Sequence, residues 1–99
     1  MRRKTYRASE LRAGRTVFIV TKTTLDHFGA CRYQVAEYLI ASKSEPQPQP
    51  GEPHPYRMHP KVARYAATVT DLWRSRRAAL REAARRQADA EAQISRRSA

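Results

Sequence analysis

All six prolines of the chain lie between residues 44 and 60, and this cluster most limits what the chain can fold into. Each proline fixes φ and lacks a backbone N–H donor, so neither a helix nor a strand ladder can continue through the cluster. Residues 46–51, Pro-Gln-Pro-Gln-Pro-Gly, favour polyproline II ending at a glycine turn. A stiff exposed loop is the preferred interpretation, and a ligand for an aromatic groove is the alternative.

The chain therefore divides into three parts of a single small domain. Residues 1–43 form a basic N-terminal segment and strand hairpin, residues 44–60 a proline-rich loop, and residues 61–99 a strand and a basic C-terminal helix. Within residues 9–22, Gly14 predicts a turn, preceded by one short helical turn and followed by a strand. The run Val17–Val20 is apolar on both faces, which predicts a central strand covered on two sides.

Residues 31–42 allow two interpretations. As a strand they form a hairpin with the first strand, but the apolar phase changes and requires a bulge near Ala36. As a helix they place Cys31, Val35 and Tyr38 on one face. We prefer the strand. A helix-turn-helix over residues 21–40 is a weaker alternative, because its first helix contains poor helix formers.

Residues 61–73 are predicted as a third strand, and Ser75 as the N-cap of a helix from about Arg76 to about Ile94. The predicted fold class is α+β: a small antiparallel sheet of two or three strands, a Pro-rich loop and one long C-terminal helix. One helical face carries a thin apolar seam, which is expected to pack against a sheet or another helix and through which two copies could pair. Its members are Leu80, Ala83, Gln87, Ala90 and Ile94.

A different face of this helix carries Arg77, Arg81 and Arg85 at four-residue steps. Acidic residues stand at helical spacing from Arg85 and Arg86, but not from Arg77 or Arg81. Those two arginines are therefore available to phosphates or to another protein's carboxylates.

The positive charge gathers at the two ends of the chain. Lys and Arg number 20 against nine Asp and Glu, a formal net charge of +11. A broad electropositive surface binds nucleic acid, or an acidic surface of a protein complex. A merely solvated charged face, in a composition rich in Arg and Ala, is the alternative. The candidate binding residues are Arg2, Arg3, Lys4, Arg74, Arg77, Arg81 and Arg85.

Other function classes find little support in the sequence. Cys31 is the single cysteine, which excludes a disulfide framework and suits the cytoplasm. The apolar run is too short to span a membrane. His27, His54, His59 and Cys31 lack zinc-ligand spacing, and the cluster of Asp26, His27 and Cys31 is a weak catalytic candidate. We therefore expect no enzyme activity, no cofactor, no metal and no membrane contact.

The stretch Leu72–Ala79 resembles the end of some small phage or mobile-element proteins, in which an aromatic residue ends a strand and Ser-Arg-Arg-Ala-Ala opens a helix. Residues 33–44 are similar to their middle strand. The resemblance implies an accessory protein in the bacterial host cytoplasm and assigns no site residue. Nucleic-acid binding is the first hypothesis, an inhibitor or adaptor that docks on a host defence or transcription complex the second, and a small virion or assembly component the third.

Overall fold

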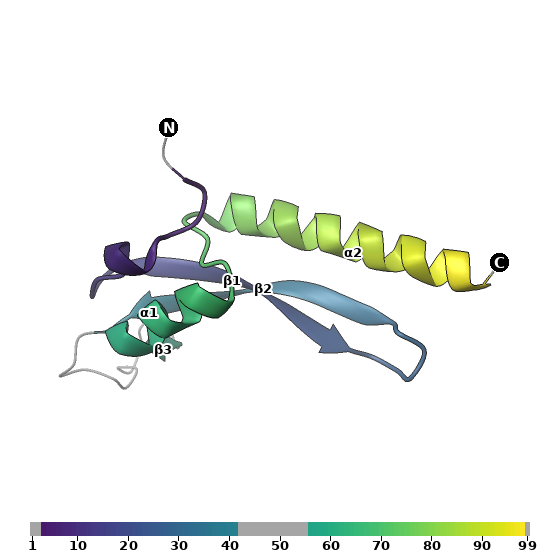
Figure 1. Cartoon of the computed structure of the whole chain (residues 1–99), viewed down its shortest axis with the longest axis horizontal. Coiled ribbons are helices and arrows are strands. Elements are labelled where there is room, and N and C mark those ends of the chain that lie inside the picture. Colours follow the sequence, from purple (N-terminus) through teal and green to yellow (C-terminus); the bar gives the residue numbers. More distant parts are fainter. Residues whose placement is uncertain (1–2, 42–55, 99) are drawn as a thin grey trace.

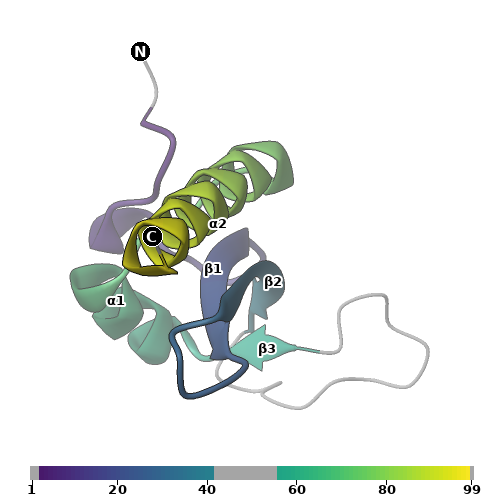
Figure 2. The same ribbon diagram turned by 90° about the vertical axis from the view of Figure 1, so that its right-hand side faces the viewer.

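The computed structural model describes residues 3–41 and 56–98, with side chains up to Arg96. The proline-rich stretch through Pro55, including the predicted polyproline II segment and His54, lies outside the described residues, as does Arg2. The elements, in chain order, are η1 (Ala8–Glu10), β1 (Thr16–Thr24), β2 (Cys31–Ile40), β3 (Arg57–Met58), α1 (Pro60–Val69) and α2 (Arg76–Ser98). This is an α+β fold, with α1 and α2 on different sides of a small sheet (Figures 1 and 2).

β1 and β2 form an antiparallel hairpin in unbroken register, from the pair Thr16–Leu39 to the pair Thr24–Cys31. The turn predicted at Gly14 is present with a positive φ of 91°, and η1 is the short helical turn expected ahead of it. The strand interpretation of residues 31–42 is confirmed. The helix-turn-helix alternative is wrong, since both of its helices are strands.

The bulge expected near Ala36 is absent from this hairpin, where Ala36 lies directly opposite Ile19 in a regular ladder. The apolar phase change has another cause. Val35 packs toward α2 while Tyr38 packs on the core beside α1, so the two faces of β2 are each covered by a different helix. A strand covered on both faces carries apolar residues at odd and even positions without a bulge.

β3 pairs with the end of β2 in parallel, which makes the three-stranded sheet mixed, in the order β1-β2-β3. The backbone N–H of Leu39 donates to Tyr56 O at 3.1 Å, and that of Ala41 to Met58 O at 2.9 Å. The expectation of a purely antiparallel sheet is therefore wrong. β3 is only two residues long and pairs with Leu39 and Ile40, the last two residues of β2.

The third strand predicted over residues 61–73 is wrong, because most of this segment is the helix α1. Pro60 occupies the first helical turn, where its missing donor costs nothing, and the Nδ1 of His59 accepts a hydrogen bond from the Lys61 N–H at 3.1 Å. The helix turns its alanines inward, with Ala63 fully buried. The β-branched residues that suggested a strand lie on its exposed side.

A short extended segment after α1 adds to the free edge of β1. The Trp73 N–H donates to Phe18 O at 2.8 Å, and the Phe18 N–H donates back to Trp73 O at 3.0 Å. Since neighbouring residues of an extended segment point to opposite faces, Leu72 and Trp73 enter different cores. The core beside α1 contains Leu11, Val17, Ile40, Ala63 and Leu72. The core beneath α2 contains Phe18, Val20, Trp73, Ala79 and Ala83.

α2 begins where the sequence predicts, with the Ser75 hydroxyl accepting from the Ala78 N–H at 3.1 Å. Its inner face contacts the sheet partly through a polar residue, Gln87. The Gln87 carboxamide accepts from the Tyr33 N–H at 2.9 Å and donates to Cys31 O at 3.0 Å, at the outer edge of β2. It thereby takes the place of a peptide group of a neighbouring strand.

The apolar seam faces the sheet, one of the partners that the sequence allows for it. Ala83 is buried against the hairpin, and Gln87 is hydrogen-bonded to it, while Leu80 is 51% exposed and lies off this face. The predicted set of seam residues is therefore wrong for Leu80. Homodimer formation through Ala83 and Gln87 would require α2 to leave the sheet.

Truncation of Trp73 tests how far the core beneath α2 depends on this residue. We expect Trp73→Ala to lower the free energy of unfolding by about 3–5 kcal/mol, the range for aromatic truncations in cores. Trp73→Phe should cost clearly less, because the Trp73 Nε1 has no hydrogen-bond partner within the described residues and most of the apolar area remains. Urea unfolding followed by circular dichroism measures both, and equal losses would contradict the apolar role.

Candidate nucleic-acid interface

An open hollow of about 360 Å³ lies beside the first turns of α2. Arg77, Arg81 and Arg85 line it from successive helical turns, and Lys4 lines it from the N-terminal segment. Two backbone hydrogen bonds position that segment: Tyr6 N–H to Leu72 O at 2.8 Å and Arg74 N–H to Lys4 O at 3.0 Å. The structure thus brings together the two basic regions that the sequence places some 70 residues apart.

A second hollow of about 350 Å³ continues along the same flank of α2 and shares Arg85 with the first. Its cations are Lys22 of β1, Arg85 and Arg86, and Gly29 of the hairpin loop also lines it. We call the cations around the two hollows the basic flank. Its members are Lys4, Lys22, Arg77, Arg81, Arg85 and Arg86.

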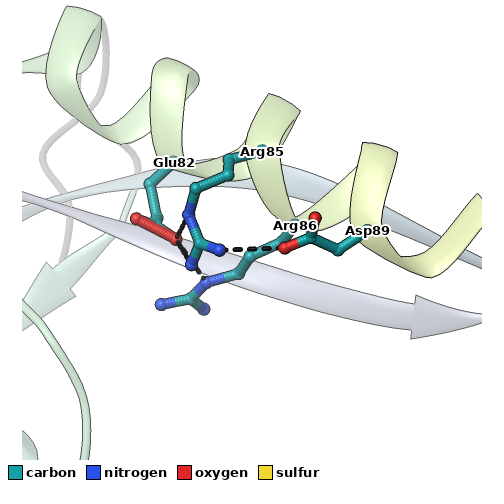
Figure 3. Close-up of polar contacts among 4 residues, drawn as sticks. All are labelled: Glu82, Arg85, Arg86 and Asp89. Atoms are coloured by element: carbon teal, nitrogen blue, oxygen red, sulfur yellow. Dashed lines mark hydrogen bonds and ion pairs between the residues drawn. The ribbon is translucent and has the colours of Figure 1, made fainter. Parts of the chain in front are cut away.

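Part of this charge is neutralised within α2 (Figure 3). Glu82 bonds both Arg85 and, at 3.1 Å, Arg86, while Arg85 also reaches Asp89 at 2.9 Å. Hydrogen bonding from Arg85 lowers the pKa of the Glu82 carboxyl, and the same contact raises the pKa of Arg85. Both groups therefore stay charged at neutral pH, and the charge of Arg85 and Arg86 is largely compensated.

Lys4, Arg77 and Arg81 differ from these paired arginines. In the described part of the chain, no carboxylate lies within ion-pair distance of any of them. All three side chains are exposed. The helical spacing rule applied to the sequence identified Arg77 and Arg81 correctly as arginines without an acidic neighbour on their own helix.

Arg74, unlike the other candidate arginines of this region, makes contacts with the N-terminal part of the fold. Its guanidinium forms an ion pair with Glu10 and lies 4.4 Å from the centre of the Tyr6 ring, with 15% of the side chain exposed. The Arg7 backbone N–H and the Arg74 side chain both lower the pKa of Glu10. Arg74 ties η1 and the N-terminal segment to the start of α2, and its charge faces the fold.

Of the remaining candidates, Arg3 is exposed next to Lys4, while Arg2 lies outside the described residues. The sequence did not single out Lys22 or Arg86. Lys22 shares the face of β1 that carries Phe18 and Val20, so strand alternation combined with the position of α2 could have found it. Arg86 was recognised only as a partner of Glu82.

The weak catalytic cluster does not assemble. The Asp26 carboxylate accepts hydrogen bonds from the backbone N–H groups of Phe28 and Ala30, at 2.8 and 3.1 Å, and so closes the hairpin loop. Cys31 is buried and His27 is exposed. Within the described ranges, no three His, Cys, Asp or Glu side chains gather in a way that could hold a metal ion.

None of the described helices is long and apolar enough to cross a membrane. Comparison with protein-family models, curated proteins and solved structures gave no significant match. The residues of the basic flank therefore carry the functional argument by themselves.

The pairing around Glu82 predicts a pH-dependent contribution to stability. Glu82→Gln should lower the free energy of unfolding at neutral pH by less than about 1 kcal/mol, because the ion pairs are on the surface. Since folding lowers the pKa of Glu82, the wild-type advantage is present above pH 4.5, the ordinary value, and disappears as the pH falls through the lowered pKa. Urea titrations of both proteins from pH 7 to pH 3 measure it, and a difference that is unchanged at pH 3 would contradict this origin.

Proposed function

We propose that the protein is a non-enzymatic nucleic-acid-binding protein that contacts phosphates through the basic flank. The observation that carries the proposal is the meeting of Lys4, Arg77 and Arg81 at one hollow without a carboxylate partner in the described residues. Cations held together in this way repel one another in the free protein. A bound polyanion relieves that repulsion and releases its own counterions.

The form of the flank also favours a phosphate backbone. Arg77, Arg81 and Arg85 rise along α2 in steps of about 6 Å, since a helix rises 1.5 Å per residue. The first turn of α2 contains no acidic residue, so its partial positive charge is not offset there. Guanidinium groups form paired hydrogen bonds with phosphate oxygens. A row of such groups binds a backbone with little dependence on sequence.

Removal of the unpaired arginines tests this proposal. Arg77→Ala/Arg81→Ala should weaken oligonucleotide binding and reduce the salt slope by about 0.7 per lost contact on a single strand, or about 0.9 on a duplex. The matched control is Arg12→Ala/Arg64→Ala, which removes the same charge from exposed positions away from the flank. Glu82→Gln should act in the opposite direction, because it removes the carboxylate that pairs with Arg86 and leaves Arg85 paired with Asp89 alone.

Fluorescence anisotropy with labelled single-stranded and duplex probes, at several salt concentrations, measures these effects. Equal losses in the two double variants would mean that net charge acts without a localised site. The absence of binding by the wild-type protein at low salt would overturn the proposal.

A second candidate function, an adaptor or inhibitor that docks on a protein complex, is favoured by a separate observation on α1. Val62, Tyr65 and Val69 are 53%, 70% and 66% exposed and follow one another at helical spacing. Solvent-exposed apolar residues arranged in this way are typical of a protein contact. The phage-type setting implied by the short resemblance stays a prediction for both functions.

Substitution of this α1 surface separates the two functions. If the protein is an adaptor, a nuclease-treated bacterial lysate should contain a stoichiometric protein partner that wild type retains and Val62→Ser/Tyr65→Ser/Val69→Ser loses. Oligonucleotide binding should be the same in both proteins. Retention of the partner by the triple variant would contradict docking through α1.

A further inference from the structure

The tip of the β1–β2 hairpin presents an aromatic side chain to solvent. Phe28 is 83% exposed, the largest exposed fraction among the large apolar side chains in the described part of the chain, and Leu25 beside it is 57% exposed. Burial of such a ring is favourable, but the folded chain leaves this one in solvent. The fold gives Phe28 no intramolecular packing role.

The loop that carries Phe28 is nevertheless well defined. Asp26 accepts hydrogen bonds from the Phe28 and Ala30 N–H groups, and the Leu25 N–H donates to Ala30 O at 2.9 Å. Gly29 has a φ of 96°, in the left-handed region that favours glycine. The turn thus holds the aromatic residue at a fixed point. The Phe28 and Ala30 N–H groups both bond the Oδ1 of Asp26.

The position of this tip connects it with the basic flank. Gly29, the neighbour of Phe28, borders the hollow that also contains Lys22, Arg85 and Arg86. The flank therefore runs along α2 from Lys4 to the base of the loop. Figure 1 shows the tip projecting past α1, under the C-terminal half of α2. A backbone bound along the flank would therefore reach the loop that carries Phe28.

We propose that Phe28 is a base-stacking residue and that the ligand class of the flank is single-stranded nucleic acid. This inference rests on the proposed function. Every base has a flat apolar face, whatever the nucleotide sequence. Stacking of bases on aromatic side chains is a common means of binding single strands. A single row of cations matches the one phosphate backbone of a single strand. The unpaired bases of such a strand are free to stack on the Phe28 ring.

An anionic membrane surface also combines negative charge with apolar contacts, but the geometry fits it less well. Phe28 and Leu25 form a small apolar tip, whereas interfacial membrane binding uses a broad apolar face. The cations extend along a helix flank that leads away from the tip. A nucleic-acid strand can follow such a line, and we therefore treat the membrane as an outcome of the test.

The full-length chain is tested with a single-stranded oligonucleotide that contains 2-aminopurine, and with an oligonucleotide of the same phosphate number in which abasic sites replace the bases. Phe28→Ala should weaken binding to the first probe by about five- to 150-fold, the equivalent of about 1–3 kcal/mol per stacked base. The salt slope and binding to the abasic probe should not change. The 2-aminopurine signal that accompanies binding should be lost.

Two further variants keep the test specific. Phe28→Trp retains a stacking ring and should bind at least as tightly as wild type. Tyr65→Ala removes a comparably exposed aromatic residue from α1 and should leave binding unchanged. Because Phe28 is largely exposed, far-UV circular dichroism of all variants should match wild type.

Undiminished binding of the base-containing probe by Phe28→Ala overturns the inference and leaves the proposed function intact. An equal loss on the abasic probe also overturns it, since Phe28 would then act on the backbone or the fold. Loss of binding to vesicles of phosphatidylcholine and phosphatidylserine, with oligonucleotide binding retained, assigns the tip to a membrane surface. If wild type binds no oligonucleotide at low salt, both the proposed function and this inference fail.

Discussion

Phe18 and Trp73 exchange two backbone hydrogen bonds at the free edge of β1, and much of the remaining structure depends on this pairing. It directs Leu72 into the core beside α1 and Trp73 into the core beneath α2. It also sets the point from which α2 starts, since Ser75 caps the helix two residues later. The same segment binds the backbone of Lys4. The cores and the basic hollow therefore have a common structural origin.

α2 buries little apolar surface against the sheet. Ala79 and Ala83 are its buried residues, and alanine methyl groups remove only a small area from water. Polar contacts also hold α2 on the sheet: Gln87 bonds the edge of β2, and Arg76 forms an ion pair with Glu37 at 2.6 Å. A helix held along one narrow line leaves most of its circumference in solvent. That geometry lets the arginines of the basic flank stay exposed while the helix is fixed in place.

Features that depend on neighbouring residues could be predicted from the sequence. The turn at Gly14, the doubly covered strand that follows and the cap at Ser75 all follow from local backbone preferences and alternation. The two failures over the C-terminal part have definite causes. The β-branched residues of α1 suggested a strand, but Pro60 and the inward alanines favour the helix. The β-branched residues lie on the outer face of that helix and are exposed to solvent. Gln87 was counted with an apolar seam, whereas its carboxamide is needed by the edge of β2.

The sequence by itself determined the α+β class, the net positive charge and the two arginines, Arg77 and Arg81, that lack an acidic neighbour along the helix. Only the tertiary structure decided which cations lie close together. It joined Lys4 and Lys22 to the arginines of α2 and turned Arg74 toward Glu10 and Tyr6. The reason is physical: charge and helical spacing are properties of short segments, whereas the convergence of cations depends on long-range pairing between residues 4, 18 and 73.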